Sequence, residues 1–323
     1  MAKRDRSSCK WCSRKGIAFI IFLMMGLLAA CEGNSHIQLH IHNHKESYLQ
    51  YYTEADIQQF ESTIAGRQKQ HSAQISLLHN QANDLLKRFQ QEVNHWGNTH
   101  LYHDPYNGFS YKTDYEYNQA QGFGSNADEA VNNAHTAGDY RAAIALITTD
   151  LAHLQAMESD EADKTPWNRP HASDLKLIHY HHLSGQIIIV SFIEQACRIY
   201  QNGKLIKSFQ VTTGHFGDPS PPGLWHIFRR RAPAIFRSYA PVGSPSWYPP
   251  TPISYAMEYH EGGYYLHDSW WRVYYGPGTN FPHYDPGGER FAGNGSHGCI
   301  NLPLRAAAWL YANTGYGTAV ITY

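Results

Sequence analysis

Apolar and polar residues follow a helical repeat through residues 54–96. The apolar positions recur at roughly helical steps between Gln, Lys and Asn residues: Ile57, Phe60, Ile64, Ile75, Leu78, Leu85 and Phe89. This spacing places them on one face of a helix. Residues 127–157 carry a second such repeat, with Asp128 and Glu129 in a first turn that favours acidic residues. Residues 100–124 are rich in Tyr, Asn, Gly and Asp, so we expect an antiparallel helix pair joined by a long loop.

The pattern changes at residue 184, where short β-branched and aromatic runs alternate with Gly and Pro. Short strand-like runs separated by Gly and Pro predict a β-rich domain. Residues 186–200 are expected to form one strand, residues 202–204 a turn, and residues 205–212 a second strand. A short helix around Trp309–Tyr311 and a final strand at Thr318–Thr322 complete the predicted elements. The expected fold class is therefore α+β and multidomain, with an N-terminal helical region followed by a β-rich domain.

The N-terminus has the pattern of an export segment. Basic residues between Lys3 and Lys15 precede an apolar run, Ile17–Ala30, which is short for a spanning helix and typical of a signal sequence. The run ends in Leu-Ala-Ala-Cys at residues 28–31, which resembles a bacterial lipoprotein box with Cys31 as the lipidated residue. An uncleaved signal anchor is the alternative. Either interpretation predicts an extracytoplasmic protein, anchored to the bacterial cell membrane by an N-terminal lipid or helix and facing the cell wall.

The predicted organisation has five segments: a signal or anchor at 1–31, a histidine-rich tether at 32–53, a helical spacer domain at 54–165, a linker at 166–183 and a catalytic domain at 184–323. The tether carries His36, His40, His42 and His44, whose alternation on a strand could bind a metal. Its polar composition favours a solvated segment, so no metal site is assigned there.

Charge and cysteine usage narrow the function. The chain has 26 basic and 27 acidic residues, which argues against a nucleic-acid-binding protein because such proteins carry a basic patch. Cys9 and Cys12 precede the export segment, and Cys197 lies in an apolar run where a buried structural cysteine is expected. Cys299 is then the candidate reactive thiol of the exported part, with a Cys197–Cys299 disulfide as the alternative.

The strongest chemical signal is Ser-His-Gly-Cys-Ile-Asn at residues 296–301, preceded by His267 in the strand-like Tyr264–Asp268. A cysteine acts as a nucleophile in its thiolate form, and a nearby histidine is the usual base. Gly298 lacks a side chain and permits a tight turn that exposes the sulfur.

This hexamer with its upstream histidine resembles the L,D-transpeptidase catalytic domain family, of the YkuD type. The stretches Thr212–Gly214 and Pro221–Trp225 are similar to the family's "TG … TPxG" region, with a proline where threonine is usual. The resemblance covers residues 184–323. It implies acyl transfer through a thioester on Cys299, with His267 as general base.

The resemblance also implies roles for neighbouring residues. Ser296, His297 and Gly298 belong to the motif and the oxyanion site, and Asn301 contacts substrate or braces the motif. His283 is an alternative base because it lies nearer to Cys299 in sequence, although its surroundings are loop-like. Aromatic residues that could line the groove are Tyr255, Tyr259, Trp270 and Trp271. A backbone carbonyl, rather than the Asp268 side chain, is expected to orient His267, because adjacent strand side chains point to opposite faces.

The implied reaction joins peptidoglycan stem peptides, so the expected partners are stem peptides and the membrane, with no cofactor and no nucleic acid. An L,D-carboxypeptidase with the same site, a non-catalytic wall-binding module and a histidine-rich metal-binding lipoprotein are the alternatives. The sequence leaves open the diamino acid used and the oligomeric state.

Overall fold

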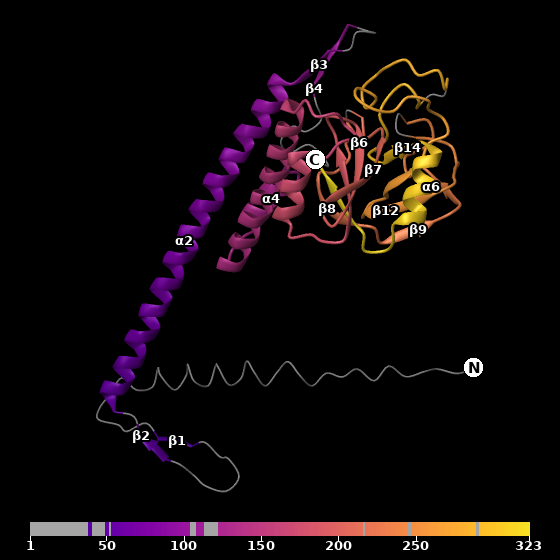
Figure 1. Cartoon of the computed structure of the whole chain (residues 1–323). Coiled ribbons are helices and arrows are strands. Elements are labelled where there is room, and N and C mark those ends of the chain that lie inside the picture. The colour runs from indigo at the N-terminus through magenta and orange to yellow at the C-terminus, as the bar shows by residue number, and fades with distance from the viewer. Residues whose placement is uncertain are drawn as a thin grey trace, which may run out of the picture. The chain divides into compact units, whose positions relative to one another are not determined.

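The computed structural model describes residues 38–40, 49–51, 53–103, 108–112, 122–215, 217–244, 247–288 and 291–323 (Figure 1). The chain divides into two units, Met1–Ala73 and Gln74–Tyr323. In the first unit, β1 (Gln38–His40) pairs antiparallel with β2 (Leu49–Tyr51). The predicted signal segment and its Cys31, and most of the tether, lie outside the described residues. None of the described helices is both long and apolar enough to cross a membrane.

Helices form the first layer of the second unit. They are α2 (Glu54–Thr99), which begins in the first unit, α3 (Ala127–Asn132), α4 (Ala137–Ala162) and α5 (Ala172–Tyr180). A capping box starts α4, because Thr136 accepts from the Asp139 N–H while the Asp139 side chain accepts from the Thr136 N–H. A hairpin of β3 (Leu101–His103) and β4 (Ser110–Lys112) follows α2. The predicted order, a helical region before a β-rich domain, is confirmed.

The predicted antiparallel arrangement of the two long helices is wrong. His79 of α2 packs against Tyr140 of α4 with ring centroids 5.5 Å apart, and further along both helices Gln155 donates to Glu92 at 3.2 Å. The residue numbers increase together, so α4 runs parallel to this part of α2. The described residues between the two helices form β3, β4 and α3. A simple loop was expected there, and a simple loop would have favoured the opposite direction.

The central layer is a five-stranded sheet in the order β7-β6-β5-β15-β8. Its strands are β5 (Gln186–Ser191), β6 (Ala196–Gln201), β7 (Lys204–Gln210), β8 (Gly223–His226) and β15 (Ala319–Thr322). Side chains alternate between its faces, as the period of a strand requires. Ile187 and Ile189 join the core under the helices, whereas Ile188 and Val190 join the core on the other side.

The single strand expected over residues 186–200 is in fact two. β5 and β6 pair antiparallel through a turn at residues 192–195, in which Gln195 adopts a positive φ of 48°. Phe192 and Gln195 are both buried, so the turn carries no exposed polar run that would mark it in the sequence.

The third layer is a four-stranded sheet in the order β14-β13-β12-β9, covered by α6 (Leu304–Asn313). Its strands are β9 (Arg229–Arg231), β12 (Ala256–His260), β13 (Tyr264–Asp268) and β14 (Ile300–Leu302). A separate pair, β10 (Ala234–Phe236) and β11 (Thr251–Ile253), lies outside this sheet. Figure 1 shows β6 and β8 between α4 on one side and β12, β9 and α6 on the other. The predicted helix at Trp309–Tyr311 and the predicted final strand are both present.

A buried polar cluster joins the helices to the central sheet. We call it the Arg198 cluster, and its members are Asp160, His171, Asp174, Glu194, Arg198 and Tyr323. Arg198 of β6 donates to Asp174 at 2.6 and 3.1 Å and to the Tyr323 hydroxyl at 3.0 Å. Residues 166–183 were expected to be a linker, but α5 forms within them and supplies Asp174 to this cluster. Their apolar Leu177 and Ile178 are also part of the core, which a free linker would expose.

Candidate active site

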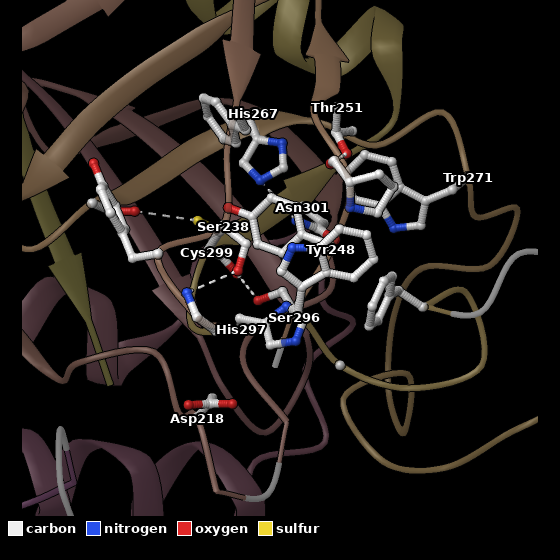
Figure 2. Close-up of a pocket in the computed structure, with 18 of the residues that line it drawn as sticks. Asp218, Ser238, Tyr248, Thr251, His267, Trp271, Ser296, His297, Cys299 and Asn301 are labelled. Carbon is white, nitrogen blue, oxygen red and sulfur yellow. Dashed lines mark hydrogen bonds between the residues drawn. The ribbon is translucent and has the colours of Figure 1, made fainter. Parts of the chain in front are cut away.

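The parallel pairing of β13 with β14 brings the two candidate catalytic segments together. His267 of β13 lies opposite Asn301 of β14, and the turn that carries Cys299 leads directly into β14. A pocket of about 500 Å³ opens at this edge of the sheet and is lined by His267, Cys299 and Asn301, among others (Figure 2). Two residues far apart in sequence therefore face one pocket because a long-range strand pairing places them there.

The hydrogen bonds of His267 define its tautomer. Its Nδ1 lies 2.8 Å from the Asp268 carbonyl oxygen, which can only accept, so Nδ1 carries the hydrogen. Nε2 is then the basic nitrogen, and the Asn301 side-chain amide donates to it at 3.1 Å. Burial lowers the pKa of His267 to about 4, so the imidazole is neutral at physiological pH. The Asp268 carboxylate accepts instead from the N–H groups of Ser254 and Tyr255, at 3.2 and 2.6 Å.

Cys299 rests as a thiol. Its Sγ lies 3.6 Å from the Gly263 carbonyl oxygen, to which it donates. Burial raises the pKa of Cys299 to about 12, well above the solution value of a free thiol. Cys197 and Cys299 are both free, and Cys197 is fully buried in the core between the sheets. The disulfide considered as an alternative is therefore absent, and the pocket holds a neutral thiol and a neutral imidazole.

Two hydroxyl groups hold the turn that presents Cys299. Ser296 Oγ donates to the Cys299 carbonyl oxygen, and Ser220 Oγ donates to the Gly298 carbonyl oxygen at 2.8 Å. Because a trans peptide points its N–H away from its C=O, the Ser220 contact also sets the direction of the Cys299 N–H. Gly298 has a φ of 95°, and a Cβ there would collide with the Tyr264 ring. The turn thus requires glycine on both conformational and steric grounds.

Aromatic side chains make up much of the pocket wall: Phe236, Tyr239, Trp247, Tyr248, Trp270, Trp271 and Phe291. Two aromatic residues expected in the groove lie elsewhere. Tyr259 is buried in the core between the two sheets, and Tyr255 packs its ring against Tyr311 at a centroid distance of 5.4 Å. Neither lines the pocket, because their side chains point into or along the core rather than to the open edge.

The alternative base, His283, does not line the pocket. Its ring Nδ1 lies 2.7 Å from the Phe281 carbonyl oxygen. Its backbone N–H donates to the Gly293 carbonyl at 2.9 Å. It belongs to the loop that separates His267 from the motif. Arg272 holds that loop closed by donating to the carbonyl oxygens of Phe291 and Asn294 at 3.1 and 3.0 Å.

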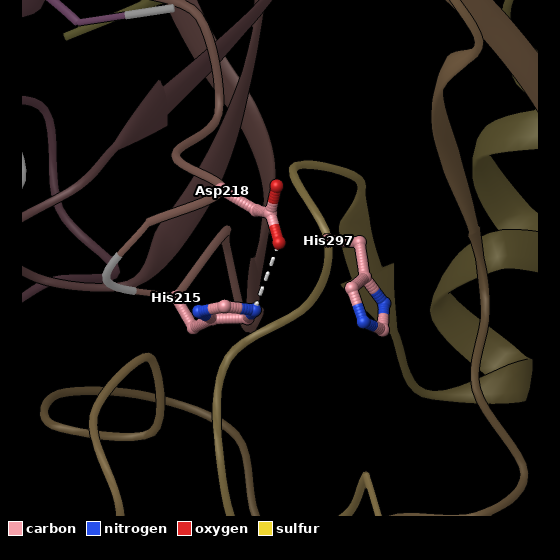
Figure 3. Close-up of side chains that lie close together, drawn as sticks. All are labelled: His215, Asp218 and His297. Carbon is pink, nitrogen blue, oxygen red and sulfur yellow. Dashed lines mark ion pairs between the residues drawn. The ribbon is translucent and has the colours of Figure 1, made fainter. Parts of the chain in front are cut away.

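Three residues at the pocket edge form a further group that the sequence analysis did not assemble. We call His215, Asp218 and His297 the pocket cluster (Figure 3). His215 Nε2 lies 3.2 Å from Asp218 Oδ2, and one ligand atom from each of the three side chains falls within 4.8 Å of the others. Asp218 and His297 also line the pocket of Cys299. The available sequence signal was His-x-x-Asp directly after the Thr212–Gly214 stretch.

Comparison with known proteins finds similarity in the C-terminal part of the chain. Residues 185–322 match the L,D-transpeptidase catalytic domain family, YkuD. L,D-transpeptidase 2 of Mycobacterium tuberculosis is 27% identical over 122 residues, which are 37% of this chain and 26% of that protein. The chain thus spans about a quarter of this curated relative.

Solved structures that match part of the chain include the catalytic domain of Enterococcus faecium L,D-transpeptidase, at 24% identity and a TM-score of 0.35, covering 44% of this chain and 99% of that one. An L,D-transpeptidase from Mycobacterium smegmatis matches at 22% identity and a TM-score of 0.36, covering 43% of this chain and 59% of that one. The match to the family model covers the β-rich part of the chain, and the helical region lies outside that match.

Proposed function

We propose that this protein is a peptidoglycan L,D-transpeptidase that joins stem peptides through a thioester on Cys299. The observation that carries the proposal is the convergence of Cys299, His267 and Asn301 on one aromatic pocket, within a segment that matches this catalytic domain family. The donor would be a stem peptide in the pocket, and the acceptor an amine on a neighbouring stem.

The neutral thiol and imidazole suit a base-assisted attack. The Cys299 thiol gives its proton to His267 Nε2 as Sγ attacks the donor carbonyl carbon. The N–H groups of Gly298 and Cys299 are the expected donors to the oxyanion that forms. The C–N bond then breaks, and the leaving amine takes the proton from His267, which leaves a thioester.

The second half reverses these proton movements. An acceptor amine attacks the thioester carbonyl and passes its proton to His267. The C–S bond breaks, and the thiolate of Cys299 recovers the proton from the imidazolium. Throughout, the Asp268 carbonyl oxygen accepts from Nδ1–H and stabilises the positive ring more than the neutral one. Asn301 holds the ring plane in place in the resting state.

The location of the protein is part of the same proposal. The N-terminal segment would attach the chain to the cytoplasmic membrane, through a lipid on Cys31 or an uncleaved helix, with the pocket on the wall side. A wall-building acyltransferase has to work on that side, because its substrates are there.

Intact-mass spectrometry of the full chain after incubation with a carbapenem tests the nucleophile. We expect one covalent adduct, which is lost in Cys299→Ala and retained in Cys197→Ala, because the Cys197 thiol is fully buried in the core. A folded protein that forms no adduct would contradict the proposal. Donor tetrapeptide with an acceptor stem then separates the outcomes: a cross-linked dimer supports a transpeptidase, and a shortened donor alone indicates a carboxypeptidase.

A further inference from the structure

We propose that the pocket cluster, His215, Asp218 and His297, binds a divalent transition-metal ion, with Zn²⁺ as the ion that fits best. The group offers two imidazole nitrogens and one carboxylate oxygen, which are ordinary zinc ligands. Figure 3 shows the three side chains converging from two separate loops. This inference concerns ion binding alone, so it stands whether or not the proposed acyl transfer is correct.

The distances suit a tetrahedral ion. Ligand bonds of about 2.0–2.2 Å at tetrahedral angles place ligand atoms roughly 3.3–3.6 Å apart. His215 Nε2 and Asp218 Oδ2 are already 3.2 Å apart, and all three ligand atoms lie within 4.8 Å of one another. One pair therefore already has about this spacing, and we expect side-chain rotation to bring the third ligand atom to it.

The backbone holds the two imidazoles near each other. The His215 N–H donates to the Ser296 carbonyl at 2.8 Å, and the Ser296 N–H donates to the Thr213 carbonyl at 2.9 Å. Gly295 permits this approach, because a Cβ there would lie only 2.6 Å from the backbone nitrogen of His215. The ring centroids of His215 and His297 are consequently 5.5 Å apart. A site built on fixed backbone loses little conformational freedom when the ion binds.

The cluster is also open enough for an ion to enter. The side chains of His215 and Asp218 are 21% and 40% exposed, and Asp218 forms an ion pair with His215. Three protein ligands leave a fourth position, as in zinc sites that bind a water or a substrate group. Because Asp218 and His297 line the pocket, that position would face the space beside Cys299.

Zinc binding to the full chain, stripped of metal with a chelator, tests the site. Equilibrium dialysis with ZnCl₂ measures the bound ions per chain in the wild type, His215→Gln, Asp218→Asn and His226→Gln. His226 is an exposed histidine on β8 and serves as the matched control. The chain has 21 histidines, so background binding is expected and the difference between variants is the readout.

We expect His215→Gln and Asp218→Asn each to lose one equivalent, or at least tenfold in affinity, with His226→Gln unchanged. Circular dichroism and the melting temperature confirm that each variant is folded. Co²⁺ added instead of zinc should give visible absorption that the same two variants lose. Equal zinc binding in all four proteins would overturn the proposal. Loss of the ion in Cys299→Ala with retention in Asp218→Asn would also overturn it, because the thiol would then be the ligand.

Discussion

The Arg198 cluster and the pocket cluster contain almost the same chemical groups in opposite settings. Asp160, His171 and Glu194 place ligand atoms within 4.8 Å of one another, as His215, Asp218 and His297 do. Asp160 and His171 are completely buried beneath the helices, whereas the pocket cluster is half exposed at the edge of a pocket.

Within the part of the chain that the structure describes, what separates them is a cation supplied by the protein to the buried cluster. Arg198 donates to Asp174 and Glu194 and lies 3.5 Å from Asp160, so its guanidinium occupies the place that an ion would take. A buried carboxylate needs such a partner, because unpaired burial of a charge is very costly. The pocket cluster lies near water and has no such requirement. Donor type and spacing are therefore insufficient to identify an ion site, and the neighbouring charges decide.

The largest effect is expected from removing the internal cation. Arg198→Met would leave Asp160 and Asp174 buried without their guanidinium, at a cost of about 3–5 kcal/mol in the free energy of unfolding. Urea unfolding followed by circular dichroism measures it. Arg141→Met is the matched control, since Arg141 is an exposed arginine on α4. We expect its midpoint to stay where it is, because substitutions at exposed positions change stability little. Equal midpoints for the two variants would show that the Arg198 cluster does not anchor the helices.

For the pocket, the informative measurement is the pH dependence of the acylation rate rather than the stability of the fold. Burial lowers the pKa of His267 to about 4, and the base must be neutral to accept the thiol proton. The acylation rate should thus be level from about pH 7 down to about pH 5, then fall roughly tenfold per pH unit below pH 4. An ordinary histidine would already lose activity below about pH 6.5. Carbapenem reactions that are quenched at set times and analysed by intact-mass spectrometry give the acylation rate at each pH. An acidic limb centred near pH 6.5 would contradict a buried His267 base.

The smallest effect is expected from a change within the pocket cluster. Asp218→Asn keeps the shape of a half-exposed side chain, so the free energy of unfolding should change by no more than about 0.5 kcal/mol. The same substitution at Asp160 replaces a buried acceptor of Arg198 and Ser191 and should cost about 1–3 kcal/mol. Chemical denaturation of both variants compares the regions directly. A larger loss for Asp218→Asn than for Asp160→Asn would reverse the proposed division of roles.

Local patterns predicted several parts of the molecule correctly. The helical repeat after residue 54 predicted most of α2, and the change of pattern at residue 184 located the start of the β-rich domain. Gly298 was expected to allow a tight turn. Its φ is positive, and a side chain at this position would collide with the Tyr264 ring. These features depend on neighbours in sequence, which is why they can be read without a fold.

Such patterns did not predict the relative direction of the helices or which side chains are buried. The repeats of α2 and α4 do not tell in which direction the two helices run, and the turn between β5 and β6 begins and ends at buried residues, Phe192 and Gln195. Tyr259 and Trp270 look alike in sequence, yet one packs between sheets and the other stands at the pocket. Burial of an aromatic side chain depends on the layer that covers it.

The sequence by itself determined the chemistry available to this protein: the Cys299 thiol in a glycine turn, and a histidine on an upstream strand. Only the tertiary structure decided that β13 and β14 pair in parallel, so that Asn301 meets His267 and His283 lies outside the pocket. It likewise decided that His215 and His297 face each other while Arg198 is enclosed by carboxylates. The physical reason is that pairing between distant strands and loops sets both the distance between charges and their exposure to water, and these two quantities govern pKa and ion binding.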